Sequence, residues 1–234
     1  MNWDKVWTAN NLERMLVGDL FTQGHAGGLL LTVWIAGIAI VASTVLGMLL
    51  GVMRASDRSL LRLPALIYIQ TFRNVPLLIL VFWAYFAPPY LGIETSKFVS
   101  VAVALTMFTT AYIAEYIRGG ILSVPDTQRE AARTLGLSAT QIQLYVVLPQ
   151  AFFNMIPAIT GRYIVTVMNT SLAFLIGLSE LTDIGKQINV RLQTSPIEVY
   201  LTLMLIYFIV NRGLSAGMRW LEHRPRFNRF FLKI

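Results

Sequence analysis

The chain has 234 residues, of which 56% are hydrophobic and only 13% are charged. A soluble domain carries about 25% charged residues because its surface faces water, so much of this surface must contact something other than water. Cys is absent, and the two histidines, His25 and His223, lie near opposite ends of the chain. This excludes a disulfide framework and a thiolate metal site, and no metal site or catalytic centre is expected. The net charge of +7 comes from short basic clusters between apolar runs, so nucleic-acid binding is not expected.

Residues 1–28 contain several charged side chains before any long apolar run begins. A secretory signal would place its apolar core closer to the start, so this segment is expected to be retained. Two interpretations stay open: an extracytoplasmic interfacial helix anchored by Trp3 and Trp7, or a disordered tail.

Long apolar runs follow at intervals along the chain. About 20 such residues cross the hydrocarbon core as a helix. The second crossing can begin as early as Leu63, and Pro149 and Pro157 interrupt the fourth. We expect an all-α integral membrane protein with one transmembrane domain at 29–218 and a basic tail at 219–234. Its five predicted transmembrane helices are 29–53, 74–93, 98–117, 149–178 and 197–218.

Lys and Arg are distributed unequally between the two sides that five spans define. Short cytoplasmic loops retain these residues, so the richer side is predicted to be cytoplasmic. The N-terminus is then outside and the C-terminus is cytoplasmic. The outer side receives Lys5, Arg14, Lys97, Lys186 and Arg191. The inner side receives Arg54, Arg58, Arg62, Arg118, Arg129, Arg133, Arg212, Arg219, Arg224, Arg226, Arg229 and Lys233.

The loop between spans three and four, residues 119–148, contains helix start and stop signals. Thr127 with Glu130 has capping-box spacing, and so does Ser138 with Gln141. Gly136 is placed to end the first helix in a left-handed turn. The sequence predicts a short capped helix, a tight turn and a second helix leading back to the membrane.

Small residues on the first of these helices would allow a partner's backbone to approach closely. Ala131 and Ala132 lie beside Leu135, and charged residues that could fix orientation in a partner's groove flank them: Arg129, Glu130 and Arg133. The alternative is an interfacial helix on lipid headgroups.

This loop also resembles a known family. Glu130-Ala131-Ala132, Gly136 and 146–149 match the pattern E-A-A-x3-G-x9-I-x-L-P of ABC-importer permeases, with Val146 in place of Ile. Three further segments, 72–76, 111–120 and 169–172, are similar to elements of polar-amino-acid permeases. The position before Asn169, often Lys in that subfamily, is Met168.

The resemblance implies a type I ABC-importer permease fold and a multi-pass protein of the bacterial inner membrane. Residues 127–136 would be the coupling helix, which docks in the cytoplasmic ATPase. The implied coupling residues are Thr127, Arg129, Glu130, Ala131, Ala132, Arg133, Leu135 and Gly136. The implied partners are an ABC ATPase dimer that binds ATP and Mg, a second permease subunit (same or sister chain) and an extracytoplasmic amino-acid-binding protein. No cofactor is expected in this chain.

Ionisable residues within spans are costly and usually face a bundle interior or a wet cavity. Glu115 and Arg118 have i,i+3 spacing and are predicted to pair at a helix end. Arg73 lies about 15 Å into a helix that starts at Leu63, near mid-membrane, or at the interface if the span starts at Asn74. For Arg162, too, the sequence leaves open whether the side chain lies near mid-membrane or at the interface. A substrate carboxylate could meet either arginine, and the predicted pathway is Arg73, Asn74, Arg162, Asn169, Thr170 and Ser171.

The sequence contains no G-x-x-x-x-G-K-[ST] segment, so energy must come from a partner or from an ion gradient. The predicted function is the non-catalytic permease subunit of an ATP-driven amino-acid importer. The alternative is an ion-gradient-driven secondary transporter of small polar solutes, which would be expected to show internal repeats and more intramembrane acids.

Overall fold

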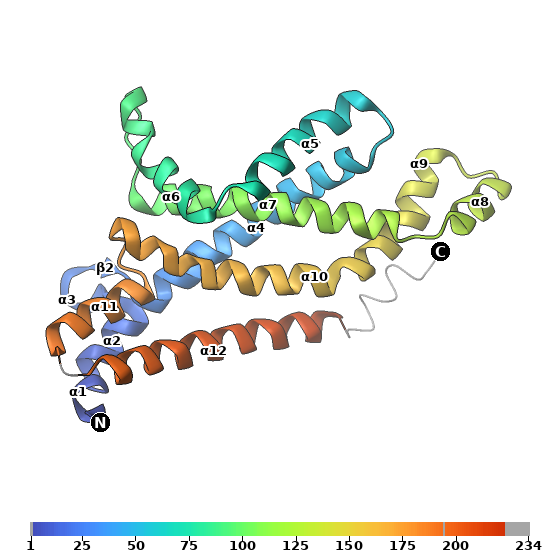
Figure 1. Cartoon of the computed structure of the whole chain (residues 1–234). Coiled ribbons are helices and arrows are strands. Elements are labelled where there is room, and N and C mark those ends of the chain that lie inside the picture. The colour runs from blue at the N-terminus through green and yellow to red at the C-terminus, as the bar shows by residue number, and fades with distance from the viewer. Residues whose placement is uncertain (1, 194, 223–234) are drawn as a thin grey trace. The chain divides into compact units, whose positions relative to one another are not determined.

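The structure is a computed structural model that describes residues 2–193 and 195–222 (Figure 1). The described residues do not include 223–234, which contain Arg224, Arg226, Arg229 and Lys233 of the predicted basic tail. The elements are α1 (Trp3–Val6), α2 (Ala9–Val17), β1 (Gly18–Asp19), α3 (Leu20–Gln23), β2 (His25–Ala26), α4 (Gly28–Ala55), α5 (Ser59–Asn74), α6 (Leu77–Phe86), η1 (Pro88–Leu91), α7 (Lys97–Leu122), α8 (Asp126–Thr134), α9 (Ala139–Gln141), η2 (Ile142–Val147), α10 (Leu148–Asn169), η3 (Thr170–Ile176), α11 (Leu181–Leu192) and α12 (Pro196–Glu222).

These elements form two compact units. Unit 1 comprises Met1–Val41, Val75–Phe108 and Ile164–Gly213, and unit 2 comprises Ala42–Asn74, Thr109–Tyr163 and Leu214–Ile234. The helices α4, α7, α10 and α12 each contribute residues to both units.

The predicted helical membrane protein is confirmed, with four to five candidate spans. Four continuous stretches are long and apolar enough to cross a membrane: Gly28–Ala55, Lys97–Leu122, Ala139–Ile176 and Pro196–Glu222. The helices Ser59–Asn74 and Leu77–Leu91 pass the same test only as a pair, and together they would make the fifth span. One small addition to the all-α prediction is the antiparallel pairing of β1 with β2.

The predicted second span, 74–93, is interrupted near its start. Its helical part begins at Ser59, and the chain breaks between Asn74 and Leu77. Pro76 adopts φ −58° and ψ 134° and cannot donate a backbone hydrogen bond. A residue before proline is also biased away from the helical region, so Val75 and Pro76 end α5 together.

The N-terminal segment is helical and packs within unit 1, so the interpretation as a disordered tail is wrong for residues 2–28. Val6 and Met15 are fully buried and share a hydrophobic core with residues of α11 and α12. The Trp7 indole donates a hydrogen bond to the Thr202 hydroxyl at 3.0 Å. In Figure 1, α2, α3, β2 and α11 gather at the end of unit 1 where the chain begins.

Gly28 joins this segment to α4. It has φ +57°, and a β-carbon there would lie 2.4 Å from the Met15 carbonyl oxygen. Its N–H donates to the Ser179 carbonyl at 2.9 Å. Only glycine satisfies both the left-handed backbone and this close approach.

In unit 2, α4 and α7 approach each other closely at two glycines. A β-carbon on Gly47 would lie 2.6 Å from the Ile113 side chain, and one on Gly51 would lie 2.7 Å from Ile117. Small residues spaced by four let helix backbones come together within a membrane. This contact fixes α7, which carries the charged residues described below.

Candidate functional site

The predicted coupling helix is α8, which follows α7 after a three-residue connection. It begins at Asp126, and the residue before it, Pro125, is extended with ψ 142° and makes no side-chain cap. The predicted Thr127 and Glu130 capping box is therefore wrong. Pro125 is the N-cap residue with φ −57°, and the Asp126 carboxylate lies in the first turn of the helix, where negative charge is favoured.

The end of α8 agrees with the prediction. Gly136 has φ +81°, and the N–H of Leu137 donates back to the Ala132 carbonyl. This pattern satisfies the last carbonyls of the helix. The second predicted capping box, Ser138 with Gln141, is confirmed in both directions and opens α9.

The predicted coupling residues divide into two groups by exposure. Ala132 is 5% exposed, and Arg129 points back toward α7, where its Nη2 donates to the Ile121 carbonyl at 2.9 Å. Arg129 Nε also lies 3.6 Å from Asp126 Oδ1. The exposed group comprises Thr127, Glu130, Ala131, Arg133, Leu135 and Gly136. Leu135 is 81% exposed, a large apolar side chain at the helix end that is free to meet a partner.

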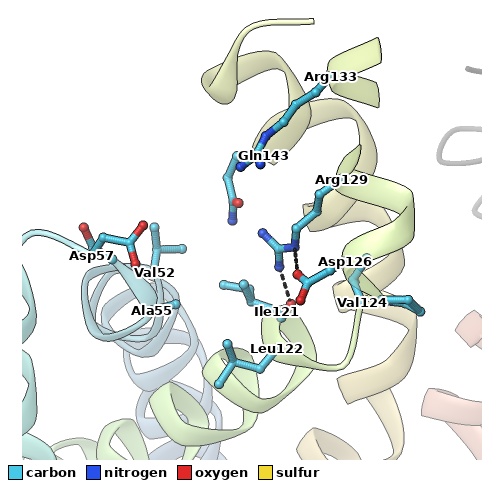
Figure 2. A pocket seen from close by; sticks show the side chains of 12 residues that line it. Val52, Ala55, Asp57, Ile121, Leu122, Val124, Asp126, Arg129, Arg133 and Gln143 are labelled. Carbon is cyan, nitrogen blue, oxygen red and sulfur yellow. Dashed lines mark hydrogen bonds and ion pairs between the residues drawn. The ribbon is translucent and has the colours of Figure 1, made fainter. Parts of the chain in front are cut away.

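A cleft of about 660 Å³ lies between α8 and the end of α4. Figure 2 shows Val52, Ala55 and Asp57 on one wall, with Arg129 and Arg133 across from them. Among the described residues, neither Asp57 nor Arg133 forms an ion pair. The exposed part of α8 thus stands clear of α4.

The predicted Glu115 and Arg118 pair is part of a larger cluster in unit 2. Arg118 Nη2 lies 3.0 Å from Glu115 Oε2, and its Nε donates to both carboxylate oxygens. Arg73 Nη1 lies 3.7 Å from Oε2, and Arg54 Nε lies 3.9 Å from Oε1. The pair does not close the helix, because α7 continues to Leu122. One carboxylate therefore faces three guanidinium groups from three helices.

Arg162 lies close to this cluster. Its guanidinium carbon is 3.9 Å from the centre of the Tyr112 ring, and that of Arg73 is 5.3 Å from the same ring. Arg162 is 6% exposed, so its charge is held within unit 2. Asn74, at the end of α5, is exposed and donates to the Gln70 carbonyl. The structure thus brings two of the predicted pathway arginines onto one aromatic side chain.

The other predicted pathway residues, Asn169, Thr170 and Ser171, belong to unit 1. They lie where α10 gives way to η3, and Thr170 is buried with its hydroxyl donating to the Val167 carbonyl at 2.7 Å. Asn169 and Ser171 are partly exposed.

Glu180 is a buried acid in unit 1 that the sequence reasoning missed. It precedes α11, and its two oxygens accept the backbone N–H groups of Thr182 and Asp183. The Tyr207 hydroxyl is 3.2 Å away, and the Thr32 hydroxyl is 3.5 Å away. Burial raises the pKa of Glu180 to about 7, although the backbone hydrogen bonds act to lower it. The only signal in the sequence was an acid directly before a helix, which does not reveal burial.

The structure is a helical membrane domain with an exposed, sharply terminated helix, α8, between two candidate spans. A family model described as "Binding-protein-dependent transport system inner membrane component" matches residues 43–227. The chain therefore belongs to this family of multi-pass inner-membrane proteins.

Several individual proteins are similar to this chain. The probable glutamine ABC transporter permease protein GlnP of Bacillus subtilis (strain 168) is 37% identical over 210 residues, which cover 87% of this chain and 96% of the relative. The glutamine transport system permease protein GlnP of Escherichia coli (strain K12) is 32% identical over 227 residues, or 96% and 98% of the two chains.

Solved structures of ABC transporters are also similar to this chain. The crystal structure of an amino acid ABC transporter with histidines matches with a TM-score of 0.77 and 30% identity, covering 84% of this chain and 92% of that one. The inward-facing MetNI methionine ABC transporter matches with a TM-score of 0.67 at 22% identity, which shows the fold alone. The fold is that of an ABC-importer permease, the non-catalytic membrane component of a transporter whose partner ATPase binds ATP. The alternative of an ion-gradient-driven transporter is therefore dropped.

Proposed function

We propose that this protein is the permease subunit of an ATP-driven importer of polar amino acids, and that glutamine is the first substrate to test. The observation that carries the proposal is α8, which follows the family's loop pattern and leaves Glu130, Ala131 and Leu135 exposed. Relatives that match nearly their whole length are named as glutamine permeases.

The proposed orientation puts the N-terminus outside and α8 in the cytoplasm. It rests on the unequal distribution of Lys and Arg. Unit 1 would then present α2 and α11 to an extracytoplasmic binding protein. The exposed residues of α8 would dock in an ATPase dimer, and a second permease subunit, identical or related, would complete the pathway because one chain has few spans to enclose it.

Within that pathway, we assign Arg73 and Arg162 to the substrate carboxylate, and Asn74, Asn169, Thr170 and Ser171 to polar contacts along the route. A guanidinium binds a carboxylate through two parallel hydrogen bonds, which favours this pairing over a simple ammonium contact. Every amino acid has an α-carboxylate, so these arginines would not select among side chains.

The test is reconstitution of the permease, its ATPase and its binding protein in liposomes, with L-glutamine uptake and ATP hydrolysis measured together. We expect Glu130→Ala to insert normally but to lose at least fivefold in the stimulation of ATP hydrolysis by loaded binding protein. Gln128→Ala is the matched control, since Gln128 is also exposed on α8. Normal stimulation in Glu130→Ala would contradict the coupling role, and absence of uptake by the unmodified transporter would contradict the substrate.

A further inference from the structure

The three guanidinium groups around Glu115 contact it unequally. Arg118 makes hydrogen bonds of 3.0 to 3.3 Å with it. Arg73 and Arg54 approach to 3.7 and 3.9 Å, which is within ion-pair distance but too long for a hydrogen bond. Glu115 therefore belongs mainly to Arg118, and the N–H donors of Arg73 form no hydrogen bond to any described residue.

The cluster also carries excess positive charge. Three arginines face one carboxylate, which leaves two positive charges in excess among these four groups. Positive charges gathered around a single carboxylate repel one another, so an additional anion would be stabilised at this place.

Arg73 is the member best placed to bind that anion. Its side chain is 38% exposed, compared with 23% for Arg54 and 30% for Arg118. It lies one residue from the end of α5, beside the break at Val75 and Pro76, whereas Arg118 lies within α7; Arg54 is also one residue from the end of its helix but is less exposed. The more exposed side chain of Arg73 can thus turn away from Glu115.

Glu115 also lines a cavity that a solute could enter. The cavity has a volume of about 500 Å³, and polar side chains of Tyr116, Ser123 and Asn154 share its wall. The Asn154 amide donates to the Ser123 hydroxyl at 2.9 Å. Glu115, with 17% of its side chain exposed, thus borders a partly polar space.

We propose that Glu115 is a resident counter-ion that competes with the substrate α-carboxylate for Arg73. With no substrate present, Glu115 holds Arg73. An arriving amino acid takes over the Arg73 guanidinium while Glu115 stays with Arg118, and Glu115 recaptures Arg73 when the substrate leaves. Glu115 is thereby a positioning residue that limits how tightly the pathway retains its substrate. This inference rests on the proposed function, because it takes the ligand to be an amino acid.

The test measures binding of radiolabelled L-glutamine to the permease–ATPase complex in nanodiscs without binding protein. Glu115→Gln removes the competing charge, so we expect the half-saturating concentration to fall about five- to tenfold. L-Glutaminamide lacks the carboxylate. The affinity with which it competes for binding should therefore be the same in Glu115→Gln and in the unmodified protein. Adding Arg73→Gln to Glu115→Gln should abolish the gain. Glu94→Gln, at an exposed site, is the matched control and should behave like the unmodified protein.

Unchanged or weaker glutamine binding in Glu115→Gln would overturn the proposed competition for Arg73. An equal gain in the affinity of glutaminamide would overturn it as well. If Glu115→Gln does not assemble, Glu115→Asp provides the same comparison, because a shorter side chain retracts the carboxylate from Arg73 while retaining its charge. A two- to threefold gain in affinity is expected for Glu115→Asp, and the absence of any gain would overturn the proposal. Uptake of glutamine by the unmodified transporter is measured in parallel. Its absence would refute the proposed function, whereas normal uptake with no gain would refute only the exchange.

Discussion

Glu180 predicts an unusual dependence of stability on pH. Burial raises its pKa to about 7 in the folded protein, compared with 4.5 for an ordinary glutamate. Below pH 4.5, Glu180 is protonated in both the folded and the unfolded state, so the shift has no effect. Between pH 4.5 and 7, the folded state holds the proton and the unfolded state releases it, so the free energy of unfolding falls as the pH rises. Above pH 7 the free energy of unfolding is lower by the full amount that this pKa shift causes.

The size of this cost follows from the shift. Each pKa unit corresponds to about 1.36 kcal/mol, so the loss between pH 4.5 and pH 7 is about 3 kcal/mol. Glu180→Gln removes the ionisation but also one of the two oxygens that accept the N–H groups of Thr182 and Asp183. One lost hydrogen bond costs about 1 kcal/mol. The variant should be less stable than the unmodified protein at pH 5 and more stable at pH 8.

Thermal unfolding of the purified complex at pH 5 and pH 8 measures this. A change of 3 kcal/mol corresponds to roughly 6–12 °C for a domain of this size. Glu94→Gln, which neutralises an exposed acid, should leave the pH dependence unchanged. Parallel profiles for the unmodified protein and Glu180→Gln, with no crossing between pH 5 and 8, would refute the reasoning.

Three further results are expected. Gly136→Val forces a β-branched residue to φ +81° and should reduce stimulation of ATP hydrolysis, whereas Gly24→Val, with φ +72° outside α8, should not; equal losses would point to general destabilisation. In intact cells, an impermeant thiol reagent should label Gln23→Cys and not Ser138→Cys; the opposite pattern would reverse the orientation. For Arg73, Lys keeps the charge but not the planar fork, so uptake should fall several-fold with Lys and further with Gln; full uptake with Lys and little loss with Gln would contradict a carboxylate contact.

The long apolar runs and the signals around Gly136 and Ser138 could be predicted because they depend on neighbouring residues. Apolar length sets a span, a left-handed turn needs glycine, and a capping box needs two side chains three positions apart. The start of α8 was missed for a local reason. The Thr127 spacing favours a helix that starts after Thr127, but α8 begins at Asp126, so Thr127 already lies in the first turn and cannot be the N-cap residue.

The Glu115 cluster and the Glu180 contacts could not be predicted in the same way. Arg54 and Arg73 reach Glu115 from other helices, and Tyr207 and Thr32 reach Glu180 from distant parts of the chain. Such contacts depend on how helices pack, for which one sequence offers no periodic signal. Sequence spacing identified the Arg118 partner alone, because i,i+3 neighbours share a helix face.

The helix α7 connects the proposed coupling surface to the proposed substrate contact. Arg129 of α8 donates to the Ile121 carbonyl in the last turn of α7. Glu115 lies six residues earlier on the same helix, about 9 Å away at 1.5 Å per residue. A continuous helix transmits displacement along its axis, so a movement of α8 imposed by the ATPase would shift Glu115 relative to Arg73. Because that ion pair is already 3.7 Å long, a small shift is enough to change which carboxylate Arg73 binds. Under the proposal, the Arg73–Glu115 contact, which is longer than the hydrogen bonds between Arg118 and Glu115, would respond to ATP hydrolysis in this way.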